Sequence, residues 1–111
     1  MTLATEKDGD ALVVALQGQI NSANATTIEG ELLDHLENGA RKVVLDLAGL
    51  NYISSAGLRV ILLLAKKLKQ QGGALALCQI QPQVSEVFEI SGFLAILTVV
   101  DTRAAALARL G

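Results

Sequence analysis

The sequence predicts an α/β fold in which a mixed sheet of four to five strands is covered by about four helices. Three observations predict it. Strand-like and helix-like segments alternate along the chain, a turn signal near the N-terminus indicates a hairpin, and one short apolar run has the composition of a buried strand. The chain has 111 residues, of which 51% are hydrophobic, so we expect one domain with a sizeable core over residues 1–111.

The first part of the chain is expected to form a hairpin followed by a helix. Residues 2–7 are a candidate edge strand, residues 8–10 are a turn signal, and the valine-rich run 11–17 is a candidate second strand. A polar loop is expected over residues 18–24. Apolar residues then recur with helical spacing until Gly39, a residue type that commonly ends helices.

The middle of the chain is expected to form a central strand followed by a long helix. Residues 42–47 are nearly all apolar, which indicates a strand buried on both faces of the sheet. The helix is expected from near Ser55 to about Gln71. Its expected core stripe consists of Leu58, Ile61, Leu62, Ala65 and Leu68. A neighbouring helix or a partner protein is expected to cover the apolar residues on the other side, which are Val60, Leu63 and Leu64.

The last part of the chain continues the alternation of strands and helices. Residues 74–78 are a candidate strand, and Pro82 suits the first turn of a helix that ends at Ser91. A short strand over residues 94–99 is expected next. Asp101 and Thr102 are candidate caps for a final helix through Leu110.

The segment between the central strand and the long helix, residues 51–60 (NYISSAGLRV), is the most informative part of the chain. Serine suits a helix start because its side-chain oxygen accepts a hydrogen bond from a free backbone N–H of the first turn. The same position favours an added negative charge, because the N-terminal end of the helix dipole is positive. A serine here can therefore cap the helix, accept phosphate, or do both.

Residues 45–60 (LDLAGLNYISSAGLRV) resemble the motif of the anti-sigma factor antagonist family, whose members are built on the STAS domain. Residues 16–20, 72–78 and 88–93 resemble further parts of this family, so the resemblance covers nearly all of the chain. It implies the STAS fold. It also implies that Ser55, the serine two residues before the motif glycine, is phosphorylated by a partner kinase, with Ser54 as the less favoured acceptor.

The motif departs from the family pattern at two positions. Many relatives carry Asp where this chain has Ser54, directly before the phosphorylated serine, and Asp is also frequent at the loop position held here by Asn21. The replacements remove negative charge near the site. They bear on the identity of the partner more than on the fold.

The resemblance and the helix pattern together predict a partner-binding surface around the motif. Its expected members are Asn21, Ser54, Ser55, Gly57, Arg59, Val60 and Leu63. Gly57 would cost roughly 1 kcal/mol relative to alanine within a helix. That cost indicates a close approach at this position, either by the sheet or by a partner.

The function that the resemblance implies is a binding switch, not an enzyme. The unphosphorylated protein would bind an anti-sigma factor that is also an ATP-dependent serine kinase, phosphorylation of Ser55 would end binding, and a PP2C-type phosphatase would reset the switch. The alternative within the same fold is a STAS subunit of a lipid-transport ATPase complex, which has no such switch.

Several other functions lack support in the sequence. The net charge is −2, and no Lys/Arg cluster is interleaved with aromatic residues, which argues against nucleic-acid binding. No nucleotide-binding glycine loop follows a strand, and neither His35 nor Cys78 has metal-ligand companions, so no cofactor or metal is expected. No signal segment or membrane span is evident, and we expect a cytoplasmic protein without direct membrane insertion.

Overall fold

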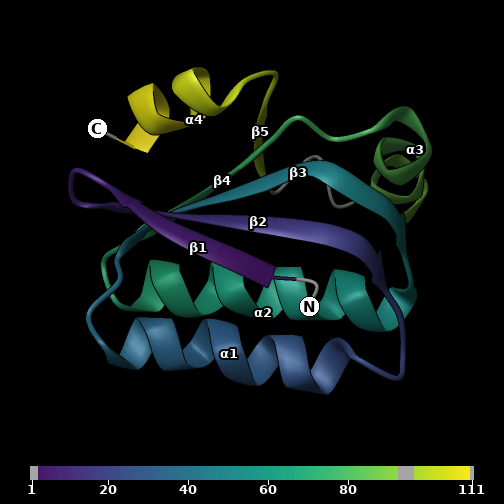
Figure 1. The fold of residues 1–111 in the computed structure, drawn as a ribbon, viewed down its shortest axis with the longest axis horizontal. Coiled ribbons are helices and arrows are strands. Elements are labelled where there is room, and N and C mark those ends of the chain that lie inside the picture. Colours follow the sequence, from purple (N-terminus) through teal and green to yellow (C-terminus); the bar gives the residue numbers. More distant parts are fainter. Residues whose placement is uncertain (1–2, 93–96, 111) are drawn as a thin grey trace.

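The computed structural model describes residues 3–92 and 97–110, which form a five-stranded mixed sheet with helices on both faces (Figure 1). The strands are β1 (Leu3–Asp8), β2 (Ala11–Ile20), β3 (Lys42–Ile53), β4 (Ala74–Cys78) and β5 (Thr98–Val100). The helices are α1 (Ala25–Glu37), α2 (Ser55–Gln70), α3 (Pro82–Ser91) and α4 (Arg103–Leu110). The predicted fold class is confirmed.

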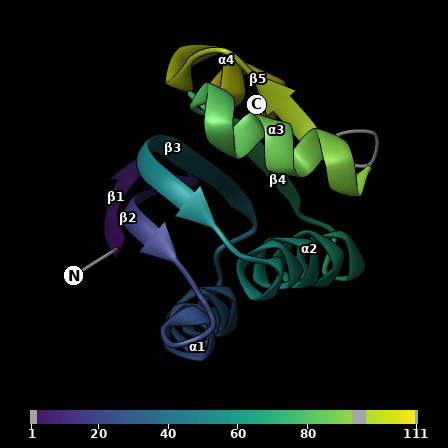
Figure 2. The same ribbon diagram turned by 90° about the vertical axis from the view of Figure 1, so that its right-hand side faces the viewer.

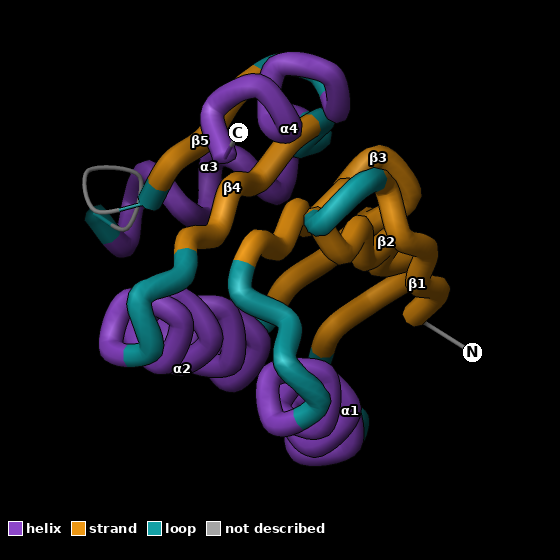
Figure 3. Tube along the Cα trace, turned by 90° about the vertical axis from the view of Figure 1, so that its left-hand side faces the viewer, coloured by secondary structure: helices purple, strands orange, loops and turns teal. Residues whose placement is uncertain are grey.

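The strands lie in the order β1-β2-β3-β4-β5, so β1 is at an edge and β3 is in the centre, as predicted. β1 pairs antiparallel with β2 through the turn at residues 9–10, whereas the other three pairings are parallel. α1 and α2 lie side by side on one face of the sheet, and α4 lies on the opposite face (Figures 2 and 3).

The alternation of side chains along β2 and β3 divides the core into two parts. Leu12, Val14 and Leu16 of β2 belong to a large hydrophobic cluster that includes the buried apolar side chains of α1 and α2. Val13, between them in sequence, belongs to a smaller cluster under α4. On β3, Leu45 belongs to the large cluster and Val44 to the small one, so the apolar run of the central strand is buried on both faces, as predicted.

A polar network attaches α4 to its face of the sheet. Asp46 of β3 is only 6% exposed, and its carboxylate accepts hydrogen bonds from the Arg103 guanidinium, at 2.9 Å from Nη2. The same carboxylate accepts bonds from the Ala48 N–H at 3.0 Å and from the Gln79 side chain at 3.2 Å. Arg103 also pairs with Glu6 of β1. A buried carboxylate needs such partners, because an unpaired charge away from water is costly.

Two strands extend further than the sequence patterns predicted. β2 continues to Ile20 and β3 to Ile53, so the expected loop at residues 18–20 and the segment 48–53 are paired strands. Register irregularities between residues 15–17 and 18–19 interrupt the simple alternation that identifies a strand. The extra length places Ile53, directly before Ser54, in the core.

The other element boundaries agree closely with the predictions where they can be compared. α3 ends at Ser91 before Gly92, and the Thr102 hydroxyl caps α4 by accepting a bond from the Ala105 N–H at 3.1 Å. The predicted strand over residues 94–99 is observed as Thr98–Val100, and its first part lies outside the described residues. No helix within residues 3–92 and 97–110 is long and apolar enough to cross a membrane.

Candidate functional site

Ser54 connects the end of the sheet to the start of α2. It is the N-cap residue, and its Oγ accepts a hydrogen bond from the Gly57 N–H at 3.2 Å. Its own backbone N–H donates to the Ile20 carbonyl at the end of β2, at 2.8 Å. The capping role that the sequence left open between two serines therefore belongs to Ser54.

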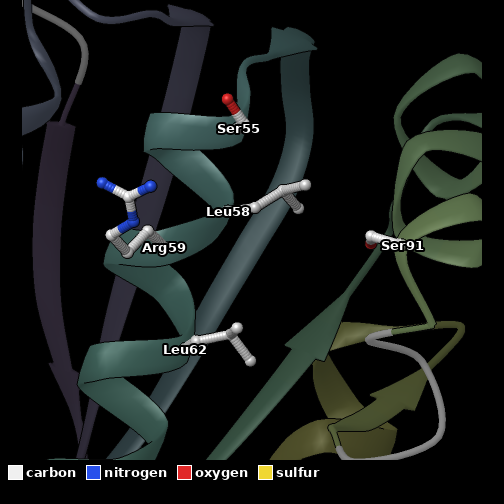
Figure 4. Close-up of a pocket in the computed structure, with 5 residues that line it drawn as sticks. All are labelled: Ser55, Leu58, Arg59, Leu62 and Ser91. Atoms are coloured by element: carbon white, nitrogen blue, oxygen red, sulfur yellow. The ribbon is translucent and has the colours of Figure 1, made fainter.

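Ser55 is the first residue of α2, and its side chain is exposed. Within the part of the chain that the structure describes, its hydroxyl makes no hydrogen bond. It projects from the first turn of the helix (Figure 4). No acidic residue lies in this first turn, where the helix dipole would favour one. The two adjacent serines thus differ in availability, because one is engaged in the fold and the other is free.

Gly57 allows α2 to approach the ends of β2 and β3. A Cβ atom added at this position would lie 2.7 Å from Ile20 Cγ2 and 2.7 Å from Ile53 Cγ1. Gly57 is itself buried. Of the two explanations for this glycine, the structure supports close packing on the sheet, and a contact between Gly57 and a partner stays a prediction.

The predicted helix faces of α2 need correction. Val60 is only 4% exposed and Leu64 only 2%, because α1 packs beside α2 and closes that side. Val60 is therefore buried between the helices in this structure, and its contact with a partner stays a prediction. Leu62 and Ala65, which were predicted in the core stripe, are partly exposed instead. Leu63 is also partly exposed, so its contact with a partner stays a prediction.

Asn21 organises the loop between β2 and α1. Its Oδ1 accepts hydrogen bonds from the Ala23 N–H at 2.9 Å and the Asn24 N–H at 3.1 Å. Asn24 returns the interaction by accepting from the Asn21 N–H at 2.8 Å. Such asparagine turns fix a loop without help from secondary structure. Asn24, which the sequence pattern did not single out, shares this turn with Asn21. The turn begins directly after Ile20, whose carbonyl accepts the hydrogen bond from the Ser54 N–H.

A groove of about 250 Å³ begins at Ser55 and separates α2 from α3 (Figure 4). Its lining residues are Ser55, Leu58, Arg59, Leu62 and Ser91. Leu58 and Leu62 point from α2 toward α3, and Arg59 lies along the outer side of α2 (Figure 4). Arg59 makes no ion pair within residues 3–92 and 97–110. Ser91 was not predicted, because nothing in its local sequence signals a neighbour on α2.

Tyr52 lies within the motif, and its exposure was not predicted from the sequence. It is 49% exposed, lies opposite Gln19 in the β2–β3 pairing, and precedes Ser54 by two residues. An exposed aromatic side chain beside an available serine is a typical anchor for a protein partner.

Cys78 and the potential metal ligands of the described residues do not gather into a metal centre. No group of three potential metal ligands occurs within the described ranges 3–92 and 97–110. Cys78 is buried on the α4 face, and burial raises the pKa of its thiol to about 11. A thiol so protonated is a poor nucleophile.

Comparison with known proteins identifies the family. The profile of the STAS domain matches residues 2–106, so the chain belongs to the STAS domain family. BtrV of Bordetella bronchiseptica, named as a candidate anti-sigma factor antagonist, is 55% identical over 108 residues, which cover 97% of this chain and 93% of BtrV.

Solved structures share the fold at lower sequence identity. A candidate anti-sigma factor antagonist from Thermotoga maritima has a TM-score of 0.93 at 24% identity, covering 97% of this chain and 93% of that protein. The unphosphorylated anti-sigma factor antagonist SpoIIAA has a TM-score of 0.82 at 19% identity, covering 96% and 94% of the two chains. SpoIIAA from Bacillus in its phosphorylated form has a TM-score of 0.74 at 18% identity, with 98% and 99% covered.

Proposed function

We propose that this protein is an anti-sigma factor antagonist that binds its partner when Ser55 is unmodified and releases it when Ser55 is phosphorylated. The observation that carries the proposal is the exposed, unbonded Ser55 hydroxyl on the first residue of α2, beside a serine that already caps the helix. Ser54 is the less suitable acceptor, because its Oγ is engaged with the Gly57 N–H. The names of BtrV and SpoIIAA, and the phosphorylated form of SpoIIAA, support the same function.

The physical basis of the switch is the cost of burying a phosphate. Phosphorylation adds about −1.5 to −2 charges and a strongly hydrated group. The helix N-terminus tolerates that charge within the protein, since its dipole is positive. A partner surface packed over Ser55 would have to remove water from the phosphate, and this desolvation opposes binding. The switch then acts at the interface and needs little change in the fold.

The proposed partner is an anti-sigma factor that is itself a serine kinase, and a PP2C-type phosphatase would restore the unmodified form. The proposed contact surface contains Ser55, Arg59 and Tyr52, which are exposed at the start of α2 and the end of β3. Leu63 and the Asn21 loop are additional candidates, and Ser54 contributes by holding the helix start in place.

Kinase labelling tests the proposed acceptor. Incubation with the cognate kinase and ATP, followed by peptide mass spectrometry, should place phosphate on Ser55. Ser55→Ala should abolish labelling, while Ser54→Ala should reduce it at most. Phosphate found only on Ser54 would overturn the assignment.

Affinity measurements separate this proposal from the alternative. Calorimetric titration of the kinase partner should show that phosphorylated protein binds about tenfold more weakly or worse, a difference of about 1.4 kcal/mol. A STAS subunit of a lipid-transport ATPase complex would bind its partner equally in both forms. Equal affinities would therefore favour that structural role.

A further inference from the structure

A row of exposed or partly exposed residues on α2 starts at Ser55 and runs along the helix. Its members, spaced four, three, four and three residues apart, are Ser55, Arg59, Leu62, Lys66 and Lys69. Residues three and four apart are neighbours on one helix face, so the row is continuous. Its length is about 21 Å at 1.5 Å per residue. We call it the basic row, because its charged members are all cationic.

The basic row borders a groove that continues beyond the hollow at Ser55. A second hollow of about 220 Å³ shares Leu62 with the first, and its other lining residues are Ala65, Lys66, Lys69 and Leu97. A third of about 200 Å³ shares Ala65, Lys69 and Leu97 with the second. The groove is apolar along Leu58, Leu62, Ala65 and Leu97, and no Asp or Glu is among the lining residues that belong to the described ranges 3–92 and 97–110.

The charge of the groove contrasts with that of the whole protein. The chain has a net charge of −2, yet the ionisable residues that line the groove are Arg59, Lys66 and Lys69. None of these three makes an ion pair within residues 3–92 and 97–110, whereas Lys42 and Arg103 pair with carboxylates of the chain. The positive charge along α2 is therefore available to a molecule from outside.

We propose that this groove binds an acidic amphipathic helix of the partner protein. Carboxylates of that helix would pair with the basic row, and its apolar side would cover Leu58 and Leu62. A groove of about 21 Å matches about 14 helical residues. Nucleic acid fits less well, because none of the described residues that line the groove is aromatic and could stack on a base.

The position of Ser55 at one end of the basic row connects the groove to the switch, and this step rests on the proposed function. Ser55 and Arg59 are four residues apart on α2, within reach of each other. A phosphate on Ser55 would attract the Arg59 guanidinium and repel the carboxylates of an incoming helix. Phosphorylation would then weaken binding along the whole row and not only at the serine.

A model peptide tests the groove without the kinase. The probe is an 18-residue helical peptide with leucines on one side and glutamates flanking them, and the control peptide replaces every glutamate with lysine. In ¹⁵N-correlated NMR spectra at physiological salt, the acidic peptide should shift signals of residues 55–69, Ser91 and Leu97, and the lysine peptide should not. Protein carrying genetically encoded phosphoserine at position 55 should bind the acidic peptide about fivefold more weakly or worse.

Two neighbouring lysines provide a matched pair of variants. Lys66 lines the groove, whereas Lys67 is exposed about 100° further round the same helix. Lys66→Glu should weaken acidic-peptide binding about fivefold or more. Lys67→Glu should weaken it by less than about twofold, because its charge projects about 100° away from that of Lys66 and is screened by salt. The same pair should show the same order of effects on binding to the anti-sigma factor.

Several outcomes would overturn the inference. Equal effects of the two lysine variants, absence of acidic-peptide binding at millimolar concentration, or shifts outside the groove would each do so. Preferential binding of a short DNA duplex or of anionic lipid vesicles would assign the groove to another class of ligand. If the kinase phosphorylates Ser55 while the acidic peptide fails to bind, the groove inference fails and the proposed function stands.

Discussion

The two faces of the sheet are packed in different ways. On the α1/α2 face, residues such as Leu45, Leu64 and Leu68 form a large hydrophobic cluster, and no charged residue of the described ranges is buried in it. On the α4 face, the buried cluster is small, and it adjoins the Asp46–Arg103 pair. Aliphatic burial stabilises in proportion to the area removed from water, whereas a buried ion pair offers little net stability but is costly to break.

This difference in packing means that α2 is held more firmly on the sheet than α4. α2, which carries Ser55 and the groove, is packed against the larger cluster and against α1. Its start is therefore held in a fixed geometry for a partner. α4 contributes one fully buried residue, Ala106, and depends on the network around Asp46. We expect α4 to detach locally at a lower free energy than that of global unfolding.

The largest expected effect comes from truncating the α1/α2 face. Leu45 is fully buried on the central strand, and Leu45→Ala should lower the free energy of unfolding by about 2–5 kcal/mol, because it removes apolar contacts and leaves a cavity. Urea denaturation followed by circular dichroism measures this. A loss below about 1 kcal/mol would mean that the cluster is not the main source of stability.

A smaller effect is expected from breaking the network on the α4 face. Arg103→Gln leaves the Asp46 carboxylate with the Ala48 N–H and the Gln79 amide as partners, and should cost about 1–3 kcal/mol. The matched control is Arg109→Gln in the same helix, since Arg109 is exposed and makes no ion pair within the described residues. Equal losses for the two variants would show that the network is not important.

The Arg103→Gln variant also tests whether α4 opens locally. Cys78 belongs to the cluster under α4, so a thiol reagent should reach it when α4 detaches. Arg103→Gln should raise its labelling rate under native conditions about tenfold for each 1.4 kcal/mol lost, and Arg109→Gln should not. Labelling rates that follow only the global stability of each variant would argue against separate opening of α4.

The fold could be predicted from the sequence largely because its signals are local. The apolar run at 43–47, the turn at 9–10 and the glycine after α3 each specify their own element. The full lengths of β2 and β3 could not be predicted, because their register irregularities break the alternation that identifies strands.

The candidate site was predicted less completely, because exposure depends on distant packing. Ser55 and Arg59 were identified from the motif, and both are exposed. The sequence left open whether a neighbouring helix or a partner covers Val60, because helical periodicity within α2 alone cannot place α1. The groove, and Ser91 as one of its lining residues, were not predicted for the same reason. The groove forms only where α3 lies beside α2.

The two faces of the sheet can also be compared through two helix caps of the same kind, one on each face. Ser54 caps α2 and Thr102 caps α4, each by accepting one N–H bond. Replacement of either by alanine should weaken its helix by about 1 kcal/mol. For Ser54→Ala, the loss of stability should lower the urea midpoint of global unfolding. For Thr102→Ala, it should appear mainly as faster Cys78 labelling, because α4 is expected to open locally. Ser55→Ala should change neither, because its hydroxyl has no partner in the described residues.

The smallest expected effect is the pH dependence that Cys78 contributes. Burial, followed by the nearby Asp46 charge, raises the pKa of its thiol from 9.0 to about 11. Between these values the unfolded chain releases a proton that the folded protein retains, so stability should fall as pH rises. The fall should be below about 1 kcal/mol near pH 9.5, because a full unit of pKa shift corresponds to about 1.4 kcal/mol. Cys78→Ala lacks the thiol and should show a flatter alkaline profile in urea denaturation. Identical profiles would mean that α4 leaves Cys78 in contact with water, and the two faces would then differ less in burial than the structure indicates.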